Sequence, residues 1–299
     1  MTAPDKISKT APGPRAPGRG RKAPRKGLGF GELPLHLLVL IIGAFVVVPL
    51  VYGVLGGFKS NQQLSSNPLG LPDPWVPSNY TDVLVSGTFW RQVFNSTFIA
   101  ICTMLVTVGV AALAAFVFAR FAFRGRELLF MYFSMGMMFP FAVAILPLFV
   151  LLRAFGLLDN PWGVILPQAA FGLPLTIIIL RQFFRTIPGE IEEAAILDGC
   201  STFGFFWRIL LPMARPALAT VAVLAIVSSW NNFMLPLVVF NDPVWHTLPV
   251  GVQQFKGQYS SDTARVLAYV VLAMIPALAF YSVAERHLVG GLTAGATKG

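Results

Sequence analysis

A short polar cluster interrupts an otherwise apolar stretch, and its side chains are the first that could do chemistry. The cluster comprises Ser228, Ser229, Trp230, Asn231 and Asn232, within an apolar run at about 217–240. Buried amides can hydrogen-bond the hydroxyl groups of a polar ligand, and an indole ring can stack on a flat ligand face. Gln168, in another apolar run, offers the same chemistry. Hydrogen bonding between neighbouring helices is the alternative and preferred interpretation, so no residue is assigned to solute binding.

Candidate catalytic and metal-binding residues do not converge in the sequence. The histidines stand singly at His36, His246 and His287, while Cys102 falls in an apolar run and Cys200 in a polar loop. These counts exclude a disulfide scaffold and a cysteine-rich metal site. A GxxxxGK[ST] phosphate-binding loop is absent, and the Ser and Asp residues form no recognisable triad or carboxylate pair. We therefore expect this chain to have no enzyme activity, no metal and no cofactor of its own.

The composition places these residues in a membrane protein. Hydrophobic residues make up 56% and charged residues 12% of the chain, and the mean hydropathy is +0.70. Soluble domains carry about 25% charged residues. Six runs reach the roughly 20 apolar residues that a membrane helix needs. They lie at about 34–58, 96–118, 128–152, 162–180, 217–240 and 266–283. Because lipid cannot satisfy backbone hydrogen bonds, we predict an all-α integral membrane protein with six transmembrane helices.

The positive charges between the runs orient the spans. If the N-terminus is cytoplasmic, 17 of the 22 Lys and Arg residues lie inside and 5 outside, as the positive-inside rule requires. Eight of them belong to a Pro- and Gly-rich tail, residues 1–30, which is predicted to be disordered. A nucleic-acid-binding arm is the alternative for this tail; a cytoplasmic anchor is preferred. The six spans then occupy 31–290, and 291–299 form a short cytoplasmic tail.

The cytoplasmic loop between spans four and five, at about 185–216, has the most informative local pattern. Pro188 suits a first helical turn, and the acidic residues that follow it complement the positive end of a helix. Gly199 is a natural helix stop, and Ser201 can cap the next helix. The spacing predicts two short helices around a turn. An apolar stripe on the second helix must pack under its own bundle or contact a partner protein: Phe203, Phe206, Trp207 and Leu210.

The same loop matches the signature of ABC importer membrane subunits. That signature reads EAA, three residues, G, nine residues, I, one residue, LP. It is filled by Glu193, Ala194, Ala195, Gly199, Ile209, Leu211 and Pro212. Segments 118–130, 230–239 and 247–255 resemble the carbohydrate branch, and the chain from span one to span six resembles the maltose-type second permease subunit. Cys200 is the one departure, because the sugar branch usually has alanine there.

The resemblance implies how the loop works. Its first helix would be a coupling helix that docks on a cytoplasmic ATPase subunit through Glu193, Ala194 and Ala195. Gly199 would provide the turn to the second helix. The remaining residues would tie that helix to span five: Ile209, Leu211 and Pro212. ATP and Mg would be used by the partner ATPase.

Further partners and a location follow from the same resemblance. A second permease subunit would complete the pore, with a heterodimer preferred over a homodimer. An extracytoplasmic solute-binding protein would deliver a sugar or oligosaccharide to the outer loops at about 59–91 and 241–264. The second loop carries aromatic candidates for this contact, namely Trp245, Phe255 and Tyr259. The implied location is the bacterial inner membrane, in contact with lipid and not with nucleic acid.

Two other classes of protein compete with this interpretation. A stand-alone secondary transporter or channel explains six spans but not the loop signature. It is further disfavoured because no Asp, Glu, Lys or Arg lies deep in a predicted span. An integral membrane enzyme would need a polar catalytic cluster at the interface, and none is visible. The sequence therefore favours an importer permease.

Overall fold

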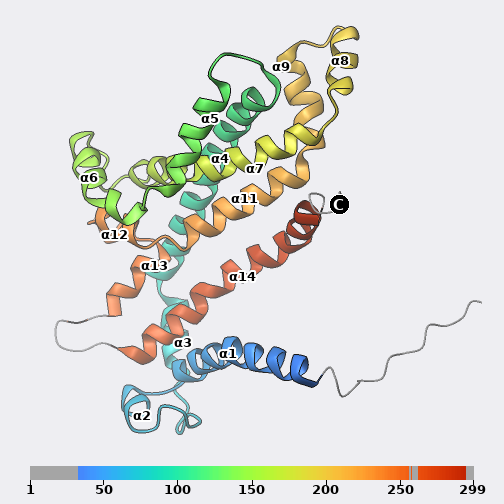
Figure 1. Cartoon of the computed structure of the whole chain (residues 1–299). Coiled ribbons are helices and arrows are strands. Elements are labelled where there is room, and N and C mark those ends of the chain that lie inside the picture. Colours follow the sequence, from blue (N-terminus) through green and yellow to red (C-terminus); the bar gives the residue numbers. More distant parts are fainter. Residues whose placement is uncertain (1–32, 256, 258–261, 294–299) are drawn as a thin grey trace, which may run out of the picture. The chain divides into compact units, whose positions relative to one another are not determined.

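The computed structural model describes residues 33–255, 257 and 262–293, and this part of the chain is helical without a strand (Figure 1). The chain divides into two compact units, residues 1–48 and 49–299. Helix α1 (Leu33–Gly57) begins in the first unit and ends in the second. It is apolar all round, which is typical of a lipid-facing helix. The predicted tail, residues 1–30, precedes α1 and lies outside the described residues.

Four described helices are long and apolar enough to cross a membrane. They are α1, α4 (Gly87–Arg120), α7 (Trp162–Thr186) and α14 (Thr263–Thr293). They contain the first, second, fourth and sixth predicted runs. Helix α14 also takes in the first residues of the predicted C-terminal tail. If two bent helix pairs are counted as one span each, the described residues hold up to six spans.

The third predicted run is bent rather than straight. It forms α5 (Arg126–Met135), the 3₁₀ turn η2 (Gly136–Met138) and α6 (Phe141–Ala154), with a bend of 97°. The break falls at Phe139 and Pro140. A residue before proline is disfavoured in the helical region, and Phe139 is extended, with φ −78° and ψ 117°. The proline is therefore the physical cause of the bend.

The fifth predicted run is also interrupted. Helix α11 (Arg215–Trp230) stops before α12 (Met234–Val239). Asn232 caps the start of α12, because its side-chain oxygen accepts the backbone N–H of Leu235 at 3.2 Å. At its other end, α11 forms the second bent pair with residues 202–213, at 78°. The prediction of one continuous helix over 217–240 is thus wrong, while its apolar character is retained.

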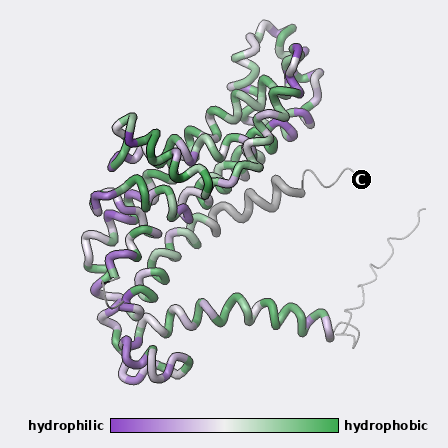
Figure 2. The backbone as a smooth tube through the Cα atoms, turned by 60° about the vertical axis from the view of Figure 1, so that its left-hand side comes forward, coloured by the Kyte–Doolittle hydropathy of each residue, from purple (hydrophilic) through white to green (hydrophobic). Residues whose placement is uncertain are grey.

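Short elements fill the connections. Between α1 and α4 lie α2 (Asn61–Ser66) and α3 (Ser78–Val85). Between α12 and α14 lie η4 (Pro243–Trp245), α13 (Leu248–Gly251) and η5 (Val252–Phe255). Between α7 and α11 lie α8 (Gly189–Leu197), α9 (Thr202–Phe205), the π-helical turn η3 (Phe206–Leu210) and α10 (Leu211–Met213). Figure 2 shows hydrophobic residues dominating the long helices.

The centre of the second unit is formed by α4, α7 and α11. Helix α4 packs most extensively on α7 and next on α11, and α14 packs on α11 (Figure 1). Small side chains on α4, at Ala111, Ala112 and Ala115, allow the helices to approach closely. This arrangement supports the loop helices α8 and α9 at one end of the bundle.

Asp159 fastens the turn between α6 and α7 to the segment after α12. Its carboxylate accepts the backbone N–H groups of Asn241 at 2.6 Å and Asp242 at 2.8 Å. The residue adopts φ +52°, a left-handed conformation that Asp tolerates better than most residues. The backbone hydrogen bond from Asp242, followed by that from Asn241, holds the pKa of Asp159 below its usual range.

We predict that Asp159→Ala lowers the thermal unfolding temperature in detergent by roughly 2–4 °C, because hydrogen bonds worth about 1 kcal/mol are lost. Because the pKa is depressed in the folded state, the ionised carboxylate stabilises the fold above its unfolded pKa. That contribution is lost as the pH falls through the folded pKa. Asp159→Asn, which keeps an acceptor and tolerates the same φ, should lose only the pH-dependent part. An Ala variant as stable as the wild type at neutral pH would contradict the clamp.

Candidate functional site

The predicted helix–turn–helix between α7 and α11 is formed as the sequence indicates. Helix α8 carries Glu190 and Glu192 in its first turn and ends at Asp198. Gly199 has φ +81°. Its N–H donates to the carbonyl of Ile196, and the N–H of Cys200 donates to that of Ala195, both at 2.9 Å. This pair of bonds is the Schellman ending, which requires a left-handed residue at the Gly199 position.

The second half of the loop begins with the predicted cap and then widens. The hydroxyl of Ser201 accepts the N–H of Gly204 at 3.1 Å and caps α9. The next turn, η3, is π-helical, with the N–H of Leu211 donating to the carbonyl of Phe206. Pro212 follows directly and has no N–H to give to the carbonyl of Arg208 four residues earlier. The wider turn therefore accompanies a proline, and π turns of this kind are frequent at functional sites.

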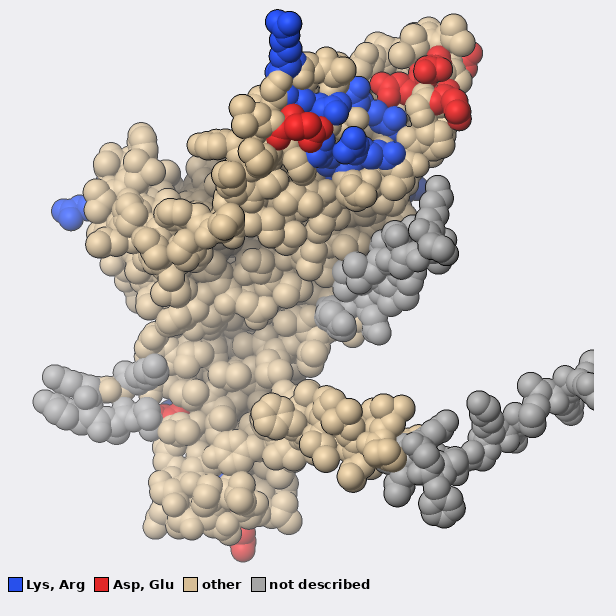
Figure 3. All heavy atoms as spheres, viewed as in Figure 1, with Lys and Arg blue, Asp and Glu red and all other residues tan. Residues whose placement is uncertain are grey.

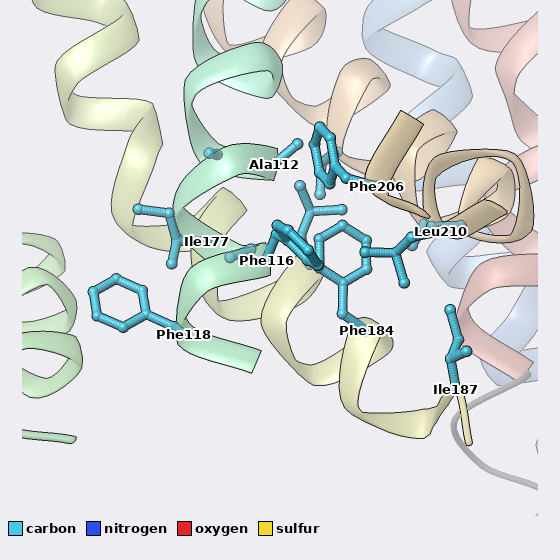
Figure 4. Close-up of a cluster of buried hydrophobic side chains, with 14 of the residues drawn as sticks. Ala112, Phe116, Phe118, Ile177, Phe184, Ile187, Phe206 and Leu210 are labelled. Carbon is cyan, nitrogen blue, oxygen red and sulfur yellow. The ribbon is translucent and has the colours of Figure 1, made fainter. Parts of the chain in front are cut away.

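A hydrophobic cluster joins the loop to the ends of α4 and α7. Phe205, Phe206 and Leu210 are buried against α4 and α7 residues, and the rings of Phe116 and Phe206 are 5.0 Å apart. Figure 4 shows Phe116, Phe184 and Leu210 pointing toward one another from three elements. Because interiors packed this closely have low compressibility, the cluster fixes α9 and η3 against the ends of α4 and α7.

Arg120, the last residue of α4, adds a polar connection. One of its terminal nitrogens donates to the carbonyls of Phe184 at 3.0 Å and Ile187 at 2.9 Å, at the end of α7. Its Nε lies 3.6 Å from the carboxylate of Glu192 on α8. A single guanidinium thus ties together α4, the C-terminus of α7 and the first turn of α8.

A second arginine, Arg181, connects α7 to α4 and α5. Arg181 of α7 is 5% exposed. It donates to the carbonyl of Phe118 at 3.2 Å and to the carboxylate of Glu127 on α5, and it lies over the ring of Phe130 at 3.8 Å. Figure 3 shows Lys and Arg side chains gathered at this end of the molecule, with Asp and Glu side chains beside them.

The outer side of the loop is an exposed surface of mixed character, which we call the loop surface. It consists of Glu193, Ala194, Ile196, Leu197, Phe203 and Trp207. Leu197 is 88% and Phe203 64% exposed. These apolar side chains lie at the charged end of the protein (Figure 3), and exposed apolar patches mark sites of contact with a partner protein or a membrane.

The structure separates the residues of the predicted signature into two groups. Glu193 and Ala194 belong to the loop surface, and a side chain on Gly199 would meet no atom within 4 Å. Ala195 is 7% exposed and faces the protein's own hydrophobic cluster. The last three divide similarly, with Ile209 and Leu211 packed on the cluster and Pro212 exposed. Ala195 therefore seats α8 on the bundle and is not accessible for docking.

The apolar stripe predicted on the second helix is divided in the same way. Phe206 and Leu210 are buried under the bundle, while Phe203 and Trp207 form an exposed edge-to-face pair at 6.0 Å. Packing under the protein's own bundle is therefore confirmed for Phe206 and Leu210, and contact with a partner protein stays a prediction for Phe203 and Trp207. The ties made by Arg120 and Arg181 are not evident from the sequence, in which each arginine lies just after a predicted span, at 96–118 and 162–180.

The polar residues of the fifth run also lie on two sides. Ser228, Ser229 and Asn232 line a cavity together with Gln168. Trp230 and Asn231 border a different hollow beside α14. Among the outer-loop aromatics, Trp245 lines a third hollow and Phe255 packs on Tyr269, whereas Tyr259 lies outside the described residues. In the described part of the chain, no three His, Cys, Asp or Glu side chains gather as metal ligands.

Several known proteins resemble this chain in sequence or in fold. The chain is 34% identical to the diacetylchitobiose uptake system permease protein NgcG of Streptomyces coelicolor, over 87% of each chain. It is 33% identical to the trehalose transport system permease protein SugB of Mycobacterium tuberculosis, over 87% of this chain and 95% of that protein. Both similarities extend well beyond the loop signature.

A solved structure and a family model agree with these relatives. In the crystal structure of a bacterial ABC transporter involved in the import of the acidic polysaccharide alginate, one chain matches at a TM-score of 0.76 and 23% identity. The match covers 87% of this chain and 98% of that chain, and it shows a common fold. The model of the binding-protein-dependent transport system inner membrane components matches residues 107–289, more than half of the chain. The protein is therefore a member of this family of inner membrane transport components.

Proposed function

We propose that this chain is a permease subunit of an ABC importer for a sugar or oligosaccharide, and that it forms half of the translocation pathway. Six spans, counting each bent pair as one, would place both termini in the cytoplasm, as the distribution of positive charge indicates. A second permease subunit supplies the other half of the pathway. ATP and Mg are bound by separate cytoplasmic ATPase subunits, and this chain binds no cofactor.

The observation that carries this proposal is that the loop surface is exposed on one side and packed against α4 and α7 on the other. Exposed Ile196, Leu197, Phe203 and Trp207 offer apolar contact area to an ATPase subunit. The side beneath them is fixed to α4 and α7 by the hydrophobic cluster and by Arg120. A surface that is both accessible and immobile relative to the bundle is what a mechanical coupling requires.

The proposed coupling works as a lever. Closure of the ATPase dimer on ATP draws α8 along with it. Helix α8 passes the displacement to α7 and α4 through Glu192 and Arg120, and η3 passes it to α11. Packed elements of this kind switch between discrete positions instead of deforming. The cavity beside α11 would then be presented to one side of the membrane or the other.

The substrate class follows from the names of the relatives. NgcG is named for the uptake of diacetylchitobiose and SugB for the transport of trehalose, so we propose a saccharide cargo. An extracytoplasmic binding protein delivers it to the outer loops at about 59–91 and 241–264.

Purification in a gentle detergent from native membranes tests the proposal. We expect an ATPase and a second permease subunit to copurify, and the reconstituted complex to take up a saccharide only with ATP and the binding protein. A chain that is recovered alone in several detergents and transports solute without ATP would instead be a stand-alone carrier.

We predict that Gly199→Asp abolishes ATP-driven uptake while the protein remains in the membrane. Its side chain would project into the open space above the turn, toward the proposed ATPase, and its charge would oppose docking. Gly199→Ala is the control, since it adds only backbone strain of roughly 1 kcal/mol at φ +81°. Membrane content and uptake would be measured together. Normal uptake by a stably inserted Asp variant would contradict the assignment.

Arg120→Met is expected to uncouple the complex. The change removes the hydrogen bonds to the α7 terminus and the tie to Glu192, so uptake per ATP hydrolysed should fall several-fold while the ATPase subunits still bind. Arg185→Met, at an exposed position in the last turn of α7, is the matched control and should change neither quantity. Equal coupling ratios for the two variants would show that Arg120 has no role in transmission.

A further inference from the structure

A cavity of about 370 Å³ opens among α4, α6, α7 and α11, beside the break that follows α11. Its polar wall is formed by hydroxyl and amide side chains from α4, α7, the end of α11 and the break after it: Thr103, Thr107, Gln168, Thr176, Ser228, Ser229 and Asn232. The described residues that line it carry no formal charge. A neutral polar wall within an apolar bundle calls for an explanation, because buried polar groups are costly unless they are paired.

Gln168 is the side chain in this wall whose buried hydrogen-bonding atom lacks a partner among the described residues. It is 8% exposed. Its Oε1 accepts the hydroxyl of Ser229 at 2.6 Å and that of Thr103 at 3.4 Å. Its Nε2 is buried and has no hydrogen-bond partner among the described residues. A buried amide donor without a partner is destabilising, and a ligand that enters the cavity would supply the missing acceptor.

The hydroxyl groups around it present the complementary function. Thr107 donates to the carbonyl of Thr103 at 2.7 Å, and Thr176 donates to that of Gly172 at 2.8 Å. Their hydrogens are therefore engaged within their own helices, and their oxygen lone pairs remain able to accept. The wall thus combines a donor, Nε2 of Gln168, with acceptors, the hydroxyl oxygens of Thr107 on α4 and Thr176 on α7. A hydroxyl or amide group of a solute satisfies both kinds of site at once.

Another part of the lining is aromatic. The rings of Phe141 and Phe171 meet edge to face with centroids 4.9 Å apart, and both line the cavity. An aromatic ring suits the C–H face of a pyranose, while a carboxylate or sulfonate would need a cation that this lining lacks. The chemistry therefore favours uncharged saccharides over acidic ones.

We propose that this chain itself contributes a solute subsite in the cavity, in which Nε2 of Gln168 donates a hydrogen bond to a hydroxyl or acetamido oxygen of an uncharged saccharide. The inference rests on the proposed function and deepens it, since it selects neutral cargo such as trehalose or diacetylchitobiose over an acidic oligosaccharide.

A matched pair of glutamines provides the test. Gln92 is also buried and also accepts a hydroxyl at 2.6 Å, from Tyr269, but it does not line the cavity. In the reconstituted complex, with trehalose and diacetylchitobiose as probes, Gln168→Leu should raise the KM for uptake about fivefold for the solute carried. The maximal rate and the ATPase activity without solute should change less than twofold. Gln92→Leu should leave the KM unchanged.

Should Gln168→Leu fail to assemble, Thr176→Val and Thr220→Val replace the pair. Both threonines are buried and donate to the carbonyl four residues earlier, and only Thr176 lines the cavity. Only Thr176→Val should then raise the KM. Monodeoxy analogues of the transported sugar sharpen the result, because the analogue lacking the contacted hydroxyl should not distinguish Gln168→Leu from the wild type.

The outcomes separate this inference from the proposed function. Equal KM values for the cavity variants and their controls would overturn the subsite, leaving Gln168 paired with water or covered by the second permease subunit. Uptake of an acidic oligosaccharide alone by the wild-type complex would also overturn it, while the importer assignment would stand. A complex that takes up no saccharide at all contradicts the proposed function and this inference with it.

Discussion

The structure depends on one constraint: within a bilayer, each backbone group that leaves a helix must find a partner inside the protein. Three of the helix endings described above meet it with a side chain. Arg120 supplies donors to the free carbonyls at the end of α7. Asn232 accepts the N–H of Leu235, the second residue of α12, and Asp159 accepts the N–H groups of Asn241 and Asp242 in the connection after α12. These side chains therefore satisfy backbone groups beside the loop surface and beside the cavity.

The ending at Arg120 has consequences beyond α7. A guanidinium can satisfy two carbonyls and still face a carboxylate, because its donors point in several directions within one plane. This geometry allows one residue to terminate α7 and to hold Glu192 of α8 nearby. The hydrophobic cluster of Phe116, Phe184 and Leu210 fills the space beneath the loop (Figure 4). The polar contacts of Arg120 set the position of α8 relative to α7, and the hydrophobic cluster makes their connection to the bundle stiff.

The sequence predicted what depends on local chemistry. The turn at Gly199, the cap at Ser201 and four long apolar helices follow from residue type and spacing, and all are present. The interruption at Asn231–Phe233 was not predicted, because hydropathy averages over a window and does not register a capped break. Nor could it reveal that Ala195 faces inward or that Arg120 reaches α8, since both depend on how helices distant in sequence pack together.

The break after α11 connects the two candidate sites. If α11 continued straight into α12, the N–H of Leu235 would bond within the helix and the cap from Asn232 would not be needed. In the interrupted structure Asn232 lines one hollow and Asn231 lines another. Unwound segments inside a membrane are tolerated where they line a cavity, and transporters use them to bind solutes. Helix α11 follows η3 and α10 in the chain and lines the cavity together with α4 and α7, so all three helices that the proposed coupling would displace border the cavity.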